Sequence, residues 1–221
     1  MTNMQHPWFK FRPANPEDPI LDEDCYNHHS FNEIARKSKM PLRSWQDTIL
    51  YADDEDLDAF EICQHHKVRV MDFTANGVGL YIHSPHSGNG KSTWAYKIAR
   101  EYMEQISSVW ILGETQPVYY VNVPQLLNEL KQSFGDDNAL RRIDKYVMQS
   151  ALVIFDDIGA ENATDWAREK LYQYIDYRYA NGLACIFTSN KSVDTLDFRI
   201  ADRIKGMCKI VTFVTHSKRT T

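Results

Sequence analysis

The segment Pro85-His86-Ser87-Gly88-Asn89-Gly90-Lys91-Ser92 decides the fold class, because it joins an apolar, strand-like run to a helix-like run. Small residues let successive backbone amides turn inward around phosphate groups, and the following helix directs its positive end at them. Lys91 is expected to reach the β- and γ-phosphates, and the Ser92 hydroxyl to bind Mg²⁺. A chance Gly-Lys-Ser turn is the alternative, but the flanking strand and helix favour a phosphate-binding loop. The residues expected to bind ATP are Ser87, Gly88, Asn89, Gly90, Lys91, Ser92 and Thr93.

Around this loop, short apolar runs alternate with amphipathic runs. The run that starts at Lys91 places apolar residues three and four positions apart, which is the spacing of one buried helix face. Residues 152–155 are continuously apolar, which is typical of a parallel strand buried on both faces. We therefore expect a doubly wound α/β fold with a five-stranded parallel sheet. The predicted strands are residues 79–83, 118–123, 152–155, 183–187 and 210–214.

Two acidic residues, Asp156 and Asp157, follow the third predicted strand directly. In open α/β sheets, ligands bind beyond the carboxyl ends of the parallel strands, where this strand delivers its carboxylates. We expect Asp156 to contribute to the Mg²⁺ site and Asp157 to orient or deprotonate the attacking water. A helix cap or a turn is the ordinary alternative for such a pair. Because Asp157 is one methylene shorter than a glutamate, slow hydrolysis is expected.

Polar and basic residues near the later strands are further candidates for this site. Thr188-Ser189-Asn190 follows the fourth predicted strand, and its side chains either contact the γ-phosphate and the attacking water or cap the next helix. Arg199 and Arg203 lie four residues apart and so share one helical face. They are either ion-paired at the surface or offered to the γ-phosphate of a neighbouring subunit. Arg219 is a candidate for contacting the phosphate of its own subunit.

The net charge of −5 hides a difference between the two ends of the chain. Residues 1–66 carry 6 Lys and Arg against 13 Asp and Glu, whereas residues 67–221 carry 19 against 17. This balance argues against a uniformly basic protein that coats nucleic acid. The prolines and the acidic cluster Asp22-Glu23-Asp24 predict an extended arm over residues 1–30. Short helices are expected at residues 31–40 and 53–66.

Composition also bears on compartment and on metal binding. No apolar run approaches the roughly 20 residues of a membrane-spanning helix, and residues 1–10 lack the pattern of a signal peptide. The 4 cysteines lie far apart, which predicts reduced thiols inside a cell. Zinc is an open question for two groups whose spacing lacks the paired signature of a zinc finger. These groups are Cys25 with His28 and His29, and Cys63 with His65 and His66.

Together these motifs resemble those of the AAA+ ATPases that load replicative helicases, the DnaC/DnaI type, and of the related IstB-type transposition helpers. The resemblance extends from about Pro41 to the C-terminus, and Asp-Asp-Ile-Gly-Ala followed by a strand ending in Thr-Ser-Asn is fairly specific to this group. The segments that carry it are residues 79–92, 119–134, 152–160, 187–190, 199–203 and 216–219. The fold it implies is an AAA+ core over residues 41–221, with a short arm at residues 1–40 and no separate lid domain.

The resemblance also implies roles for individual residues. By it, Asn190 is the first sensor, Arg203 the arginine finger and Arg219 the second sensor. The helical region after the second strand is implied to contact single-stranded DNA through Lys131, Phe134, Arg141, Arg142 and Lys145. The adenine pocket of this group lies upstream of the sheet, which points to Pro41, Leu42 and Trp45, with plain packing as the alternative.

Two departures from the family pattern matter. Pro85 stands where the family has glycine, and the N-terminal part is shorter than the helicase-binding domains of the family. Residues 1–40 are nevertheless expected to bind the helicase.

The implied function is an ATP- and Mg²⁺-dependent loader of a replicative DNA helicase onto single-stranded DNA. Such a loader self-associates through ATP-bridged interfaces and hydrolyses ATP slowly. We expect it in the cytoplasm of a bacterial or phage-infected cell, without a membrane partner. A transposition-helper ATPase would instead prefer duplex DNA, and a small-molecule kinase would need an acceptor pocket and a lid that the sequence does not clearly offer. An adaptor that binds ATP but hardly hydrolyses it is compatible with Pro85 and Asp157.

Overall fold

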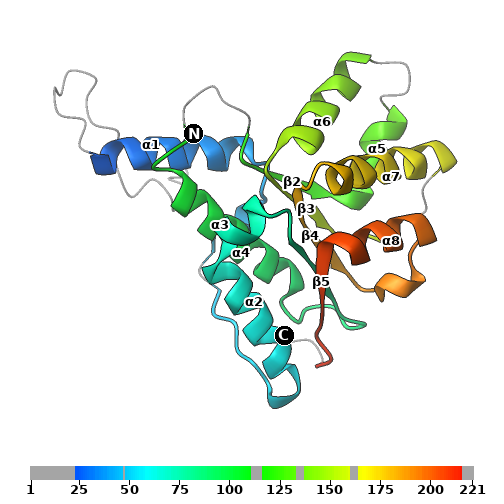
Figure 1. Ribbon diagram of the computed structural model, residues 1–221, viewed down its shortest axis with the longest axis horizontal. Helices are drawn as coiled ribbons and strands as arrows, with labels where there is room; N and C mark the ends of the chain where they lie inside the picture. The colour runs from blue at the N-terminus through cyan, green and yellow to red at the C-terminus, as the bar shows by residue number, and fades with distance from the viewer. Residues whose placement is uncertain (1–22, 47, 111–115, 133–136, 160–163, 216–221) are drawn as a thin grey trace, which may run out of the picture.

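A five-stranded parallel sheet forms the centre of the protein in a computed structural model that describes residues 23–46, 48–110, 116–132, 137–159 and 164–215 (Figure 1). The strand order is β2-β3-β4-β1-β5, and every neighbouring pair is parallel. The strands are β1 (Gly79–His83), β2 (Val118–Asn122), β3 (Leu152–Asp156), β4 (Ala184–Ser189) and β5 (Cys208–Thr212). The predicted doubly wound α/β class is confirmed, with small shifts in the ends of β4 and β5.

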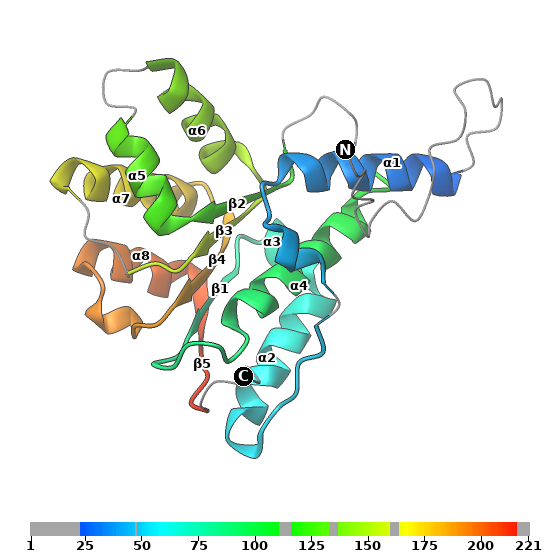
Figure 2. The same cartoon turned by 180° about the vertical axis from the view of Figure 1, so that it is seen from behind.

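Helices cover both faces of the sheet (Figures 1 and 2). One face carries α1 (Glu23–Lys37), α2 (Leu57–Val68), α3 (Val70–Ala75) and α4 (Lys91–Ile106). The other face carries α5 (Val123–Gln132), α6 (Asp137–Gln149), α7 (Asp165–Ala180) and α8 (Phe198–Met207). No helix in the described part of the chain is long and apolar enough to cross a bilayer.

The central strands β3 and β4 are buried along their whole length, because successive side chains enter the cores on opposite faces of the sheet. On β3, Leu152 and Ile154 pack in the core beneath α1–α4, whereas Val153 and Phe155 pack in the core beneath α5–α8. This is the two-sided burial expected of a parallel sheet between helical layers. The alternation also fixes the direction of Asp156, which shares the α4 side with Ile154.

The N-terminal region differs from the prediction. Helix α1 begins at Glu23, so the expectation of extended chain over residues 23–30 is wrong. Ile34 and Ala35 are buried in the same core as β1 and α4, and the Ser38 carbonyl accepts a hydrogen bond from the Tyr120 amide of β2 at 2.8 Å. The C-terminal part of α1 is therefore packed into the core beside β2, and residue 40 does not mark a boundary in packing.

The helix expected at residues 53–66 is shifted. A 3-10 turn, η2 (Asp54–Asp56), precedes α2, and the short helix α3 follows it directly. The buried Asp56 carboxylate accepts hydrogen bonds from the Val214 amide at 2.7 Å and from the Thr215 hydroxyl. The start of α2 is thereby tied to the segment that leaves β5.

A buried arginine of α7 connects the end of α6 with β4 on the face of the sheet that α5–α8 cover. The side chain of Arg178 is fully buried, and its guanidinium donates to the carbonyls of Val147, Ser150, Ala151 and Ala184 at 2.7–3.1 Å. Carbonyl oxygens at the end of α6 are favourable partners for a cation, and they satisfy donors that would otherwise be costly to bury. Arg178 therefore fixes the end of α6 against α7 and β4.

Candidate functional site

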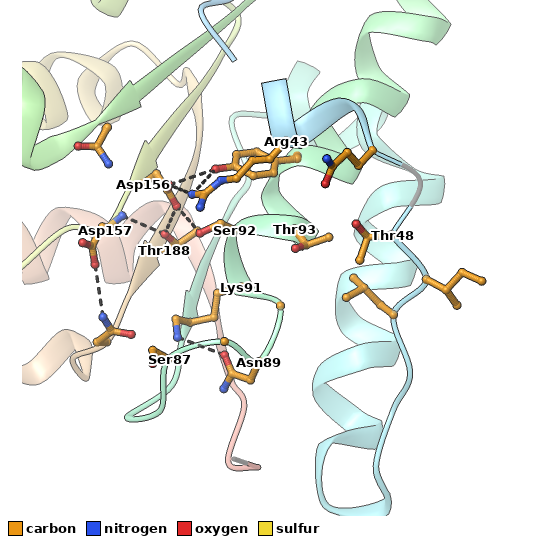
Figure 3. A pocket seen from close by; sticks show the side chains of 18 of the residues that line it. Arg43, Thr48, Ser87, Asn89, Lys91, Ser92, Thr93, Asp156, Asp157 and Thr188 are labelled. Atoms are coloured by element: carbon orange, nitrogen blue, oxygen red, sulfur yellow. Dashed lines mark hydrogen bonds and ion pairs between the residues drawn. The ribbon is translucent and has the colours of Figure 1, made fainter. Parts of the chain in front are cut away.

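The loop between β1 and α4 closes around the ammonium group of Lys91 (Figure 3). Lys91 Nζ donates to the His86 carbonyl at 2.7 Å and to Asn89 Oδ1 at 3.2 Å. Gly88 and Gly90 have φ values of 83° and 93°, in the left-handed region that favours glycine. The loop therefore has glycines at the positions whose backbone conformation requires them and wraps around Lys91, although Pro85 replaces the first glycine of the expected pattern.

Asp156 is the buried acceptor at the centre of the site, and the residue is only 2% exposed. Ser92 and Thr188 donate their hydroxyl protons to Oδ1 at 2.7 and 2.6 Å. Tyr120 and Tyr96 donate to Oδ2 at 2.8 and 3.3 Å. A carboxylate can be buried when its lone pairs are satisfied, so these four hydroxyls hold Asp156 in place.

Asp157 has a different setting, although it is the next residue. Its backbone has a φ of 63°, a region that aspartate tolerates better than most residues, and its amide donates to Thr188 Oγ1 at 3.0 Å. Its carboxylate accepts from the Asn190 amide at 3.4 Å. Burial and then the negative charge of Asp156 raise the pKa of Asp157, whereas the charge of Lys91 lowers it. The Asp156 carboxylate is therefore held by four hydroxyl groups, whereas the Asp157 carboxylate accepts one long hydrogen bond and is less constrained.

These groups open onto one cavity of about 750 Å³. Its volume lies within the range of small-ligand pockets, about 300–1,000 Å³. All residues predicted to bind ATP line it, and so do Asp156, Asp157 and Asn190. The carboxyl ends of β3 and β4 and the start of α4 thus bring the predicted motifs together, as the position of ligand sites in open α/β sheets requires.

The opposite wall of the cavity comes from the chain upstream of α2. Thr48, Ile49, Leu50 and Tyr51 line it, and Thr48 lies across from Thr93 in Figure 3. A Cβ atom added to Gly90 would lie 3.0 Å from Leu50 Cδ2, so this segment closes tightly over the loop. Its apolar side chains suit contact with the flat face of a nucleobase.

The expectation that Pro41, Leu42 and Trp45 form the adenine pocket is wrong, because none of them lines the cavity. Trp45 belongs to the 3-10 helix η1 (Leu42–Trp45) and is buried edge-on against Phe31 of α1, with ring centroids 5.9 Å apart. The large apolar ring is used in the core, and the wall is formed by the residues that follow it.

The residues present fit a magnesium-bound nucleoside triphosphate. The Lys91 ammonium and the glycine backbone match the negative charge of a polyphosphate. The Ser92 hydroxyl and the Asp156 carboxylate supply the oxygen atoms that Mg²⁺ prefers. Individual ligand contacts remain predictions.

The predicted arginines of α8 are ion-paired within the chain. Arg203 donates from Nε to Asp176 at 2.7 Å and from Nη1 to Asp202 at 2.6 Å. Arg199 Nη2 lies 3.1 Å from Glu169 Oε2, within ion-pair distance. Neither arginine lines the cavity of its own chain, so a role at a neighbouring subunit remains a prediction. Arg219 lies outside the described residues.

Part of the predicted DNA-binding set can be located. Lys131 lies at the end of α5, and Arg141 and Lys145 lie on α6; all three side chains are exposed. Phe134 and the side chain of Arg142 lie outside the part of the chain that the structure describes. DNA contact by this region remains a prediction.

The described residues contain no group of three or more His, Cys, Asp and Glu side chains placed to hold a metal ion. Cys63 is fully buried, and burial raises the pKa of its thiol to about 12. His66 stacks on Phe73, with ring centroids 4.3 Å apart. Cys63 and His66 are thus accounted for by packing, and the side chains of Cys25, His28 and His29 lie outside the described set.

Several residues of the site were missed from the sequence. They are Arg43, the wall at residues 48–51, Tyr96, Tyr120 and Asn122, and the bridging role of Thr188 was missed too. Period-two alternation offered a signal for two of them, because positions 120 and 188 lie on the same side of the sheet as the predicted Asp156, next to α4. The wall had no comparable signal, because it belongs to no regular element.

Comparisons with known proteins agree with this geometry. The DnaI replicative helicase loader of Bacillus subtilis is 32% identical over 124 residues, which are 56% of this chain and 36% of that protein. The phage-like element PBSX protein XkdC of the same organism is 28% identical over 163 residues, which are 68% of this chain and 56% of that protein. The chain therefore spans about a third to just over half the length of these relatives.

Solved structures of DnaI and of the DnaC helicase loader share the fold. The DnaI structure has a TM-score of 0.63 at 24% identity and covers 79% of this chain and 94% of its own. The DnaC structure has a TM-score of 0.60 at 22% identity and covers 77% of this chain and 98% of its own. The predicted doubly wound α/β fold is thereby confirmed. A family model described as IstB-like ATP binding protein matches residues 20–220, so this chain belongs to the family of IstB-like ATP-binding proteins.

Proposed function

We propose that this protein is an ATP-dependent loader of a replicative DNA helicase. The observation that carries the proposal is the similarity to DnaI over 124 residues, in a chain whose phosphate-binding loop, paired carboxylates and Asn190 line one cavity. The helicase-loading function named for DnaI is the activity that this arrangement fits best. Loading would place the helicase on single-stranded DNA in the cytoplasm of a bacterial or phage-infected cell.

In this proposal, each residue of the cavity has a separate role in ATP hydrolysis. Bound Mg²⁺–ATP supplies the γ-phosphate and the cation that neutralises developing charge. Lys91 binds the phosphates, Ser92 and Asp156 hold the cation, and Asp157 orients a water molecule with help from Asn190. Asp157 reaches less far than a glutamate would, so hydrolysis is slow and increases when neighbouring subunits contribute Arg203.

Partner contacts in this proposal are divided along the chain. Residues 1–40, which include the acidic cluster Asp22-Glu23-Asp24, bind the helicase, and the exposed cations of α5 and α6 follow the DNA backbone. Arg203 must leave Asp176 to reach the nucleotide of a neighbour. ATP bound between subunits then favours the assembled state.

Co-purification with the replicative helicase of the host tests the loader proposal. A deletion of residues 1–40 would remove Ile34 and Ala35 from the core, so the deletion should stop at residue 22. We expect the full chain to retain the helicase in ATP and the deletion to lose it while still binding ATP. A matched variant with Asp22→Asn, Glu23→Gln and Asp24→Asn tests charge alone. Absence of helicase from the full-length pull-down, with and without ATP, would refute the proposal.

A transposition helper is the second candidate, and the family match favours it because the family model describes IstB-like proteins. Such a helper would bind duplex DNA in preference to single strands and would co-purify with a transposase. Competition between duplex and single-stranded oligonucleotides of equal length separates the two functions. The loader proposal predicts preference for the single strand.

A further inference from the structure

Three side chains that were not predicted as site residues converge on one oxygen atom of Asp156. Tyr120 donates to Oδ2 at 2.8 Å and Tyr96 donates to it at 3.3 Å, while Arg43 Nη2 lies 4.0 Å away. Ser92 and Thr188 occupy the other oxygen, Oδ1. The carboxylate that the Mg²⁺ site requires is therefore held on one side by tyrosines and an arginine.

The two tyrosines reach Asp156 from rigid elements. Tyr120 lies on β2 beside Ile154 of β3, and Tyr96 lies in the second turn of α4. Their rings are tilted against each other with centroids 5.8 Å apart. A tyrosine hydroxyl carries its proton at neutral pH, so both side chains act as donors to the carboxylate. Neighbouring groups of this kind orient carboxylates that bind metals.

Arg43 arrives from a different part of the chain. It lies on η1, which Trp45 anchors to Phe31 of α1. Its Nη2 donates to the Tyr96 hydroxyl at 3.2 Å, and its guanidinium lies 5.9 Å from the centre of that ring. Its side chain is 59% exposed and lines the cavity, so it has room to move. The labelled side chains of Arg43 and Asp156 point toward each other in Figure 3.

We propose that Tyr96 and Tyr120 are positioning residues that orient Asp156 for a divalent cation, and that Arg43 is a positive charge that the cation displaces. A guanidinium near a buried carboxylate compensates its charge when no cation is present. The same positive charge opposes a divalent cation that approaches this carboxylate. The tyrosines therefore favour cation binding, whereas Arg43 competes with it. The inference rests on the proposed Mg²⁺ site and adds a link between η1 and that site.

Opposite effects on Mg²⁺ dependence distinguish this arrangement from simple packing. The probe is a fluorescent ADP derivative, titrated with Mg²⁺ against the full chain, with EDTA as the cation-free reference. Tyr120→Phe keeps the ring but loses the donor, and we expect the Mg²⁺ concentration at half-saturation to rise about tenfold. Arg43→Gln removes the competing charge, and we expect this concentration to fall about two- to fivefold, the range of a partly exposed ion pair.

Matched variants control for substitution alone. Tyr119→Phe changes the neighbouring residue of β2, whose ring faces the other core and stacks on Tyr146 at 5.1 Å. Arg36→Gln removes an exposed arginine of α1 that pairs with Glu33. Both should leave the Mg²⁺ dependence unchanged. Tyr96→Phe is a second test of the tyrosines, with a smaller increase because its bond is longer.

Each outcome decides the matter. Shifts of opposite sign for Tyr120→Phe and Arg43→Gln support the inference. Shifts of the same sign, or none, in variants that fold and bind the probe in EDTA as the wild type does would overturn it. A wild type whose nucleotide binding ignores Mg²⁺ would overturn both the inference and the proposed cation site. Failure to bind a helicase with the Mg²⁺ shifts intact would refute only the loader proposal.

Discussion

Asp156 and Asp157 are adjacent in sequence but occupy contrasting environments. Asp156 is 2% exposed and accepts hydrogen bonds from four hydroxyl groups. Asp157 is half-buried, has a left-handed backbone and accepts one long bond from Asn190. The difference teaches that one strand end delivers both a fixed carboxylate suited to a cation and a less constrained one suited to water.

The largest expected effect comes from Asp156→Asn. An amide at this position turns a donor toward the hydroxyls that now donate to the carboxylate, which leaves buried polar groups unsatisfied. We expect the free energy of unfolding to fall by about 3 kcal/mol. Denaturant titration measures this loss, and Asp157→Asn is the matched control. An unchanged unfolding free energy would show that the four bonds do not hold the carboxylate.

Asp157→Asn should instead abolish most hydrolysis while leaving the fold intact. Loss of a general base lowers rates by about 10²–10⁴-fold, so we expect ATP turnover to fall by at least about 100-fold. Nucleotide affinity should stay close to that of the wild type, because Lys91 and Asp156 are unchanged. An ATP turnover close to that of the wild type would show that Asp157 has no role in hydrolysis.

The raised pKa of Asp157 gives the same substitution a pH signature. A carboxyl group whose pKa is higher in the folded state stabilises the fold below its unfolded pKa of about 3.9, and this stabilisation is lost as the pH rises through the folded pKa. Asp157→Asn should therefore raise the thermal midpoint at neutral pH. The wild-type turnover should also lose activity on the acid side at a higher pH than an ordinary aspartate would dictate. A lower midpoint at neutral pH would contradict the stated environment of Asp157.

Thr188→Val tests the residue that joins the two carboxylates. Thr188 donates to Asp156 Oδ1 and accepts from the Asp157 amide, and valine has nearly the same shape without the hydroxyl. We expect a loss of about 1–2 kcal/mol in unfolding free energy, together with reduced turnover. Thr212→Val, on the exposed edge strand β5, is the matched control and should cost less. Equal losses of unfolding free energy in the two variants would show that Thr188 does not bridge the two carboxylates.

The smallest effect is expected from Asn190→Ala. Its bond to Asp157 is 3.4 Å long and exposed, so its loss should lower turnover only about three- to tenfold and leave stability unchanged. Steady-state kinetics with saturating ATP measures the change. A loss as large as that of Asp157→Asn would place Asn190 on the reacting groups themselves.

The fold and the centre of the site were predictable because they rest on local patterns. Continuous apolar runs marked β1, β3 and β4, and the Gly-Lys-Ser loop fixed the start of α4. Asp156 and Asp157 follow from the end of such a run. Each of these features is encoded in neighbouring residues, so spacing alone was sufficient.

The rest of the site depends on contacts between distant segments. Tyr120 and Asp156 are 36 positions apart, and Arg43 lies 53 positions before Tyr96. Such pairs arise only when β2 lies beside β3 and η1 packs on α4. The extent of α1 was also mispredicted, because its residues Ile34 and Ala35 are buried against β1 and α4, which lie far along the chain.

Mg²⁺-dependent nucleotide binding by Asp156→Asn and Asp157→Asn tests the central claim most directly. Titration of a fluorescent ADP derivative with and without Mg²⁺ measures it in the full chain. We expect Asp157→Asn to keep the wild-type Mg²⁺ dependence and Asp156→Asn to lose it. Loss of Mg²⁺ dependence in Asp157→Asn, with its retention in Asp156→Asn, would contradict the division between the two carboxylates.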